Sequence, residues 1–268
     1  MRIAAYQGEG VNGNVAQALD LMRETAAEAA SRGASLVVFP EMFLTGYNIG
    51  DAVSSLAEPE AGPSATEAGR IAREAGLAVL YGYPERWQGE LYNSAFLIDR
   101  SGKAVAGYRK THLYGRVEKR WFKPGDSLVI AELNGLRIGI LICYDVEFPE
   151  AVRALALAGA QLIAVPTALI QPFDMISRTL VPTRAFENQV YIAYAGMCGS
   201  EGDLGYCGLS CIVGPDGKDL ARAGSGPALL LADVDLAAIS RARDASPYLS
   251  DRRPELYAAP VDLNRRIP

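Results

Sequence analysis

The spacing of apolar and polar positions along the chain predicts strands and helices in alternation. Residues 2–7 form a short apolar run typical of a strand, and residues 14–31 have one apolar face, with Asn14 placed to cap a helix. Residues 35–39 (SLVVF) are almost entirely apolar, as expected of a strand that is covered on both faces. The same criteria predict further helices over 64–75, 149–158 and 175–188, and further strands over 77–84, 161–165 and 190–195.

Tight-turn sequences between other apolar runs predict three hairpins. The paired runs are 91–99 with 103–110, 127–133 with 136–143, and 210–214 with 219–223, followed by a strand over 228–234. Because a hairpin joins antiparallel strands, a purely parallel βαβ winding is excluded. We therefore expect an α/β fold with mixed sheets and helices on their outer faces. No repeat or linker interrupts the pattern, which predicts a single domain over residues 1–268.

Composition narrows the classes of function. Half of the residues are hydrophobic and the formal net charge is -5, so the chain can bury a substantial core. An acidic chain has no electrostatic reason to bind nucleic acid or an anionic membrane. The N-terminus shows no signal peptide, and the apolar stretches fall well short of the roughly 20 residues that span a bilayer. These features predict a soluble, cytoplasmic protein without nucleic-acid or membrane partners.

The four cysteines do not predict a disulfide framework or a metal site. Without a secretory signal disulfides are not expected, and the chain has one histidine, His112, and no CxxC pair. We interpret Cys198, Cys207 and Cys211 as small buried apolar residues. His112 is expected to orient backbone or to pack, since no G-x-S-x-G motif is present to suggest a serine hydrolase.

A glycine pattern raises one hypothesis from a different class. Gly8, Gly10 and Gly13 match G-x-G-x-x-G between a predicted strand and helix, which is the setting of a dinucleotide site. The acidic residue Glu41 lies 41 − 13 = 28 residues beyond the last glycine, whereas a spacing of about 20 is usual. The NAD-binding enzyme therefore remains a weaker alternative.

Three reactive side chains each follow an apolar run directly. Glu41 comes after VVFP, Lys110 after AGYR and Cys143 after GILI, where buried strands open at their ends. A thiol needs a base or a positive field to become a thiolate, and an ammonium can stabilise an oxyanion. Together the three predict a cysteine hydrolase. Taken singly, they also fit a surface acid, a surface lysine and a buried cysteine.

The segments around these residues resemble a known family. FPEMFLTGY (39–47), YRKTHLYG (108–115) and LICYDVEFPE (141–150) are similar, in order and separation, to the three signature segments of the nitrilase superfamily. The likeness continues through 159–168, 184–196 and 214–218. The resemblance implies an αββα sandwich, no cofactor or metal, and association into homodimers or higher homo-oligomers. A catalytically inactive binding protein on this scaffold is the other alternative, and the intact reactive residues argue against it.

The resemblance also implies a role for each residue. Cys143 matches the nucleophile, Glu41 the general base and Lys110 the catalytic lysine. Glu118 matches a second glutamate that positions substrate and supports the lysine. The backbone N–H of Tyr144 would help to bind the oxyanion.

The segment after the nucleophile bears on the substrate. Tyr144-Asp145 is typical of amidases and carbamoylases rather than of true nitrilases, and the likeness over 40–50, 80–86 and 246–256 is strongest to the branch that hydrolyses 5-aminopentanamide. The alternatives within the superfamily are an N-carbamoyl amino acid hydrolase and an ω-amidase. Glu147 stands where carboxylate-binding branches often have arginine. It would bind a substrate ammonium or pair with Arg178 or Arg184.

An ammonium that leaves water needs an anionic partner. Glu147, Asp174 and Glu201 are the acidic residues that we expect near the mouth of the pocket, and Thr167 is a further substrate-binding candidate. Gly196 departs from the family pattern, because many relatives have asparagine there. That difference affects the expected local loop geometry rather than the chemistry.

Overall fold

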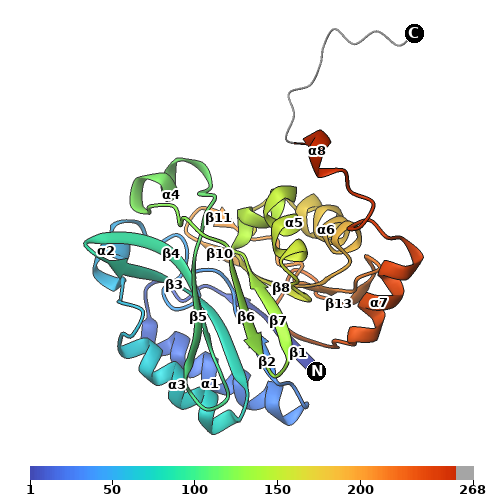
Figure 1. Cartoon of the computed structure of the whole chain (residues 1–268). Helices are drawn as coiled ribbons and strands as arrows, with labels where there is room; N and C mark the ends of the chain where they lie inside the picture. Colours follow the sequence, from blue (N-terminus) through green and yellow to red (C-terminus); the bar gives the residue numbers. More distant parts are fainter. Residues whose placement is uncertain (258–268) are drawn as a thin grey trace, which may run out of the picture.

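The first sheet is built around β1 (Arg2–Glu9) in the computed structural model, which describes residues 1–257 (Figure 1). Strand β1 runs parallel to β2, and β2 runs parallel to β3, because helices connect these strands. The hairpin strands β4 and β5 extend the sheet on one side, and β14 pairs antiparallel with β1 on the other. The elements are β2 (Leu36–Val38), β3 (Ala78–Trp87), β4 (Glu90–Ile98), β5 (Ala104–Arg109), β14 (Ala228–Asp233), α1 (Val15–Ser31) and α3 (Pro63–Ala75).

The second sheet repeats this plan. Its parallel strands β7, β8 and β9 are flanked by the antiparallel strands β6, β12 and β13. The elements are β6 (Val129–Leu133), β7 (Leu136–Ile140), β8 (Leu162–Thr167), β9 (Tyr191–Cys198), β12 (Cys211–Val213), β13 (Asp219–Arg222), α5 (Pro149–Leu157) and α6 (Val181–Asn188). The two sheets are continuous at one corner, where the end of β1 pairs with the end of β9 over two residues.

Alternation along the strands explains the layers. On β1, Ile3 and Ala5 pack in the same core as Ile138 of the second sheet, whereas Ala4 packs with Met22 of α1. Successive strand side chains point to opposite faces, so one face of the first sheet meets the second sheet and the other meets α1 and α3. Figure 1 shows α1 and α3 on one outer face and α5 and α6 on the other. The predicted αββα sandwich is confirmed.

Local sequence explains where the helices begin and end. The Asn14 side chain accepts a hydrogen bond of 3.1 Å from the Gln17 amide at the start of α1, as predicted. Gly76 ends α3 at a φ of 70°, a conformation that suits glycine. The helix predicted over 175–188 is instead a π-helical turn (Ile176–Leu180) followed by α6. Pro182 lies in the first turn of α6, where its missing N–H is tolerated.

Several short elements were not predicted. They are α2 (Val53–Leu56), α4 (Gly115–Trp121), α7 (Leu236–Ala245), α8 (Pro254–Tyr257), the β10 (Ser200–Glu201) and β11 (Leu204–Gly205) hairpin, and 3₁₀ helices at Gly50–Ala52 and Cys143–Glu147. Helix α4 has seven residues and no side-chain cap, so its sequence carries little helical signal.

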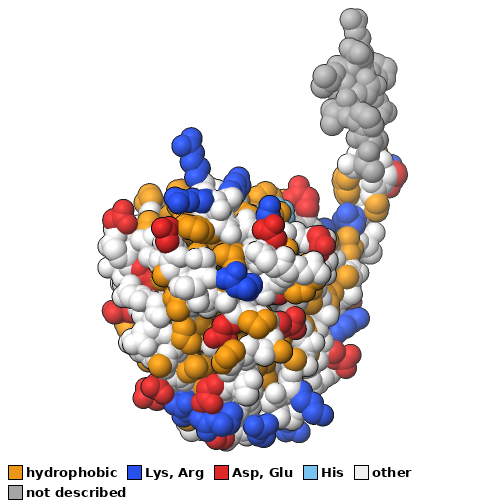
Figure 2. All heavy atoms as spheres, turned by 90° about the vertical axis from the view of Figure 1, so that its left-hand side faces the viewer, with side chains coloured by type: hydrophobic (Ala, Val, Ile, Leu, Met, Phe, Trp, Pro, Cys, Tyr) orange, Lys and Arg blue, Asp and Glu red, His pale blue; other side chains and the backbone are white. Residues whose placement is uncertain are grey.

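The outer surface carries charges of both signs among exposed apolar side chains. Figure 2 shows acidic and basic side chains together at the foot of the molecule, where Figure 1 places α1 and α3. On these two helices Glu67 pairs with Arg23 and Arg70. None of the helices described here is long and apolar enough to cross a bilayer. The predicted domain extends to residue 268, and residues 258–268 lie outside the described part of the chain.

Candidate active site

The three predicted reactive residues come from both sheets. Glu41 follows β2 and Lys110 follows β5 in the first sheet, whereas Cys143 follows β7 in the second. Cys143 begins a 3₁₀ helix with a φ of 46°, in the left-handed region that side chains other than glycine rarely adopt. Such a turn at a strand end places the thiol at the wall of a pocket, which Cys143 lines.

A glycine in β3 makes room for Glu41. The Gly82 amide donates to the Pro40 carbonyl at 3.1 Å, and the Leu44 amide donates to the Gly82 carbonyl at 3.2 Å. A Cβ atom at Gly82 would lie 2.4 Å from the Met42 nitrogen and 2.7 Å from the Glu41 Cα. The segment that carries Glu41 therefore crosses β3 at a distance that only glycine permits.

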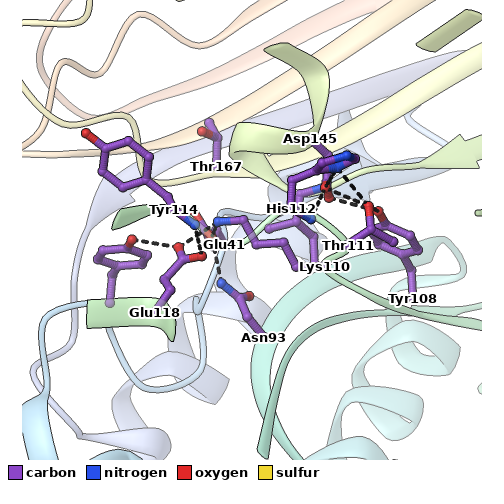
Figure 3. Close-up of polar contacts among 12 residues, drawn as sticks. Glu41, Asn93, Tyr108, Lys110, Thr111, His112, Tyr114, Glu118, Asp145 and Thr167 are labelled. Atoms are coloured by element: carbon purple, nitrogen blue, oxygen red, sulfur yellow. Dashed lines mark hydrogen bonds and ion pairs between the residues drawn. The ribbon is translucent and has the colours of Figure 1, made fainter. Parts of the chain in front are cut away.

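Lys110 connects two carboxylates inside the protein (Figure 3). Its Nζ lies 2.7 Å from Glu41 Oε1 and 2.6 Å from Glu118 Oε1, and all three side chains are almost completely buried. Asn93 Nδ2 donates to the same Glu41 oxygen at 2.7 Å. The second oxygen of Glu41, Oε2, has no hydrogen-bond partner among the described residues. One face of this carboxylate is thus free to accept a proton.

Glu118 is fixed from three directions. Besides Lys110, the Tyr47 hydroxyl donates to its Oε1 at 2.7 Å, and the Tyr114 amide donates to its Oε2 at 2.8 Å. The contact of Glu118 with the lysine agrees with the family resemblance. Tyr47 and Asn93 were not singled out from the sequence, although Tyr47 is the last residue of the first signature segment.

Burial and charge set the protonation states. Desolvation raises the pKa of Glu41, and the neighbouring Lys110 partly opposes this rise. Burial disfavours the charged form of Lys110, but Glu41 and Glu118 outweigh it and raise its pKa. Desolvation also raises the pKa of the Cys143 thiol, the Glu41 charge adds to the rise, and Lys110 lowers it. The resting thiol is therefore protonated and needs a base.

A buried carboxylate ties the Cys143 turn to the segment after Lys110. Asp145 is fully buried and accepts hydrogen bonds of 2.8–3.0 Å from the Ile142 and His112 amides and from the side chains of Tyr108, Thr111 and His112. The His112 ring also stacks on Phe148, with 3.9 Å between ring centroids. The expected orienting and packing role of His112 is confirmed.

Cys143 opens onto a cavity of about 250 Å³. Its walls are mainly aromatic and aliphatic, with a single carboxylate from Glu147; the other lining residues are Tyr47, Tyr114, Tyr144, Ala168, Leu169, Ile170 and Phe173. The Tyr144 amide lies in the first turn of the 3₁₀ helix, where N–H groups have no partner within the helix.

Of the predicted substrate-binding residues, some line the cavity and others do not. Glu147 lines the cavity. Arg184 donates to the Glu147 backbone carbonyl at 2.9 Å and pairs through its side chain with Glu187, so the alternative ion pair of Glu147 with Arg184 is absent among the described residues. Thr167 is fully buried and donates to the Tyr194 hydroxyl at 2.9 Å, and it does not line the cavity.

Two other acidic candidates do not line the cavity. Asp174 is exposed and pairs with Arg178 at 3.0 Å beside a separate surface depression. That pair also removes Arg178 as a partner of Glu147. Glu201 is buried rather than at the mouth. Sequence position placed these acids near the site but did not give the direction of their side chains.

The space beside the glycines of the G-x-G-x-x-G segment is filled by other parts of the protein. A Cβ atom at Gly10 would lie 1.8 Å from Glu201 Oε1, and the Gly13 amide donates to the Thr45 carbonyl at 2.6 Å. These glycines admit neighbouring protein groups, which argues against a dinucleotide in this segment. Gly196 lies within β9 and its amide donates to Ser210 Oγ at 2.8 Å, so the change from asparagine falls in a regular strand rather than in a loop.

The remaining cysteines are buried, as interpreted from the sequence: Cys198, Cys207 and Cys211. Only Cys143 is partly exposed. The reactive thiol is therefore distinguished by access as well as by its neighbours.

A thiol, a carboxylate with a free oxygen and a buried ammonium are the groups that an acyl-transferring hydrolase needs. The chain belongs to the carbon–nitrogen hydrolase family, whose sequence profile matches residues 2–244. It is 49% identical over 269 residues to the "Hydrolase in pqqF 5'region" of Pseudomonas protegens, covering 99% of this chain and 93% of the relative. It is 36% identical to an (R)-stereoselective amidase of a Pseudomonas species, covering 94% and 92%.

Solved structures support the same assignment. A Glu-to-Gln mutant of the amidase from Nesterenkonia sp. AN1, whose active-site cysteine carries the product of Michael addition of acrylamide, superposes with a TM-score of 0.87. The sequences are 37% identical, and the match covers 96% of this chain and 98% of the other. The chain is therefore an amidase of the nitrilase superfamily.

Proposed function

We propose that this amidase hydrolyses a small linear aliphatic amide with a terminal amine, of which 5-aminopentanamide is the best candidate, through a cysteine thioester. The observation that carries the proposal is the Glu147 carboxylate. It lies on the wall of the Cys143 cavity and has no protein cation paired with it in the described part of the chain.

In the first half of the reaction, Glu41 accepts the proton of the Cys143 thiol through its free oxygen. The sulfur attacks the amide carbon, and the carbonyl oxygen becomes an oxyanion. The Lys110 ammonium and the Tyr144 amide stabilise that charge. When the tetrahedral species collapses, the C–N bond breaks and the nitrogen takes the proton from Glu41. Ammonia leaves, and the acyl group remains on sulfur as a thioester.

In the second half, a water molecule attacks the thioester carbon through its oxygen, and Glu41 accepts one of the protons of that water. The C–S bond then breaks, the proton on Glu41 returns to the sulfur, and the carboxylic acid product leaves and loses its proton to solvent. Glu118 keeps Lys110 oriented throughout, because its Oε1 lies 2.6 Å from the ammonium while Glu41 contacts the same group. Both half-reactions use these side chains, the Tyr144 backbone amide and water.

The charge distribution of the cavity favours an amine over an acid at the far end of the substrate. Lys110 would repel a substrate ammonium near the reacting amide, whereas Glu147 would attract it at the wall. A linear chain of methylenes separates the two ends, and the aromatic walls of Tyr114, Tyr144 and Phe173 can cover it. A terminal carboxylate, as in ω-amidase or N-carbamoyl amino acid substrates, would face Glu147.

The test compares three substrates of similar length by ammonia release. We expect kcat/KM to be about tenfold higher for 5-aminopentanamide than for pentanamide, the gain of about 1.4 kcal/mol that one partly buried ion pair supplies, and lowest for glutaramate. Glu147→Gln should remove the preference for the amine, mainly through KM, and leave pentanamide unchanged. Asp174→Asn is the matched control, because Asp174 is an exposed acid outside the cavity.

Two outcomes would contradict this assignment. If Glu147→Gln lowers kcat/KM equally for the amine and the neutral amide, Glu147 has a structural role. If glutaramate is the best substrate, the protein acts as an ω-amidase.

We also propose, from the family resemblance, a cytoplasmic homodimer or higher homo-oligomer that needs no cofactor. Light scattering measures the assembly, and a monomer would contradict it. Activity that disappears with a chelator and returns with metal would contradict the absence of a metal requirement.

A further inference from the structure

A further buried carboxylate, Glu201, lies near the active site but does not line its cavity. Glu201 is in β10 and is 1% exposed. Its Oε2 accepts hydrogen bonds from the Tyr47 amide at 2.9 Å, the Asn48 amide at 2.8 Å and the Tyr206 hydroxyl at 2.6 Å. The Asn48 side chain donates to the Glu201 backbone carbonyl at 2.9 Å. Three hydrogen-bond donors therefore converge on one oxygen of Glu201, and this arrangement binds the carboxylate specifically.

The surrounding backbone is shaped to admit this side chain. Cβ atoms at Gly10 and Gly46 would lie 1.8 Å and 2.3 Å from Glu201 Oε1. That oxygen has no hydrogen-bond partner within residues 1–257. Burying a carboxylate with one unpaired oxygen costs free energy. We therefore expect the three hydrogen bonds to Oε2 to fix the positions of the segments that donate them.

Those segments connect to the active site through Tyr47 and through Tyr206. Tyr47 donates its hydroxyl to Glu118 Oε1, the oxygen that also contacts Lys110. Tyr206 forms a bridge with Ile170, which lines the cavity, and the next residue, Cys207, donates its amide to the Leu169 carbonyl. Glu201 thus holds the backbone of Tyr47, which lines the cavity, and the ring of Tyr206, whose backbone pairs with the lining residue Ile170.

We propose that Glu201 is a positioning residue for catalysis. It does not contact substrate; it fixes the loop of Tyr47 so that the Tyr47 hydroxyl orients Glu118, and Glu118 orients Lys110. The inference rests on the proposed function, because Glu118 and Lys110 affect turnover only in that chemistry.

A double-mutant cycle tests this chain of contacts. Glu201→Ala should lower kcat by about 10- to 100-fold, the scale of a catalytic group displaced by about 1 Å, with a smaller change in KM. Tyr47→Phe removes the hydroxyl that carries the effect. Adding Glu201→Ala to Tyr47→Phe should then lower kcat by less than about twofold further. Equal effects of Glu201→Ala in both backgrounds would overturn the proposal, because a general loss of structure does not depend on the Tyr47 hydroxyl.

Conservative variants keep the test valid if Glu201→Ala does not fold. Glu201→Gln can keep an oxygen in the place of Oε2 and put its NH₂ group in the place of the unpaired Oε1. It should retain more kcat than Glu201→Ala, and the same cycle can be run with it. Thermal unfolding of every variant controls for stability. Tyr206→Phe removes one of the three donors and leaves the Tyr47 contacts, so its kcat should fall less than that of Glu201→Ala.

The outcomes separate the two hypotheses. A wild-type protein that releases no ammonia from any amide refutes the proposed function. An active wild type combined with a fully active Glu201→Ala variant refutes only the positioning role.

Discussion

Replacing Lys110 by methionine is the most informative single change at this site. The side chain of Lys110 is 0% exposed and touches Glu41, at 0%, and Glu118, at 2%. Methionine has a similar length and fills similar space, but it carries no charge. The variant therefore leaves two buried carboxylates close together without the ammonium that lies between them.

The cost of this change follows from known buried ion pairs. Removing one partner of such a pair destabilises a protein by about 3–5 kcal/mol, because an uncompensated charge stays buried. The loss of the cation facing the oxyanion should lower kcat by about 100-fold or more. Lys110→Met should therefore be both less stable and nearly inactive.

The loss of stability should depend on pH. Desolvation raises the pKa of Glu41 in the native protein and Lys110 opposes this rise, so removing Lys110 raises the pKa of Glu41 further. Between the unfolded value of about 4.3 and the raised native value, the native state binds a proton that the unfolded state has released. The free energy of unfolding of the variant should therefore fall as pH rises through this range. The difference in free energy of unfolding between wild type and variant is smallest in acid. It is widest above the pKa that Glu41 has in the native variant.

Urea unfolding between pH 5 and pH 8 measures the gap, and ammonia release measures kcat. Arg109→Met is the matched control. Arg109 is the neighbouring cation and pairs with Glu85, another buried carboxylate, outside the catalytic cavity. It should lose stability but keep most activity. A Lys110→Met variant with wild-type turnover, or with a stability gap that shrinks as pH rises, would refute the reasoning.

Other predictions concern the nucleophile, the glycine in β3 and substrate charge. Cys143→Ala should give no thioester in mass spectra of protein mixed with amide, whereas wild type should show the acyl adduct. Gly82→Ala should lower kcat by about 100-fold, because its Cβ atom would displace Glu41; wild-type kcat would contradict this. Burial raises the pKa of Glu147, so the KM for 5-aminopentanamide should rise as pH falls through that value while the KM for pentanamide stays level.

The sequence predicted most of the sandwich because strands and helices here obey simple spacing rules. Strand β1 is a continuous apolar run in the sequence because both of its faces are covered: Ile3 and Ala5 pack in one core and Ala4 in the other. Helix α4 escaped prediction because seven residues without a cap show no periodicity. The pairing of β1 with β9 joins residues nearly 200 positions apart, so no local pattern could indicate it.

Only part of the site could be predicted, because the sequence indicates where strands end but not where side chains point. Glu41, Lys110 and Cys143 follow strand ends, and strand ends are readable from hydrophobicity. Asp174 and Glu201 were assigned from sequence position, which says nothing about side-chain direction. Figure 3 shows that the neighbours of Lys110 come from elements scattered along the chain, and only the folded sheets bring them together.

The left-handed backbone at Cys143 lowers the stability of the fold, and this is the cost of holding the nucleophile in its position. A side chain with a Cβ atom loses about 1–2 kcal/mol in this conformation relative to glycine. Part of that difference is recovered, since glycine also gains entropy in the unfolded chain, about 0.4–1 kcal/mol. Among inactive variants, Cys143→Gly should therefore be more stable than Cys143→Ala by roughly 0.5–1 kcal/mol. That reverses the usual order of these two residues and is a direct measure of the trade-off between stability and function at this position.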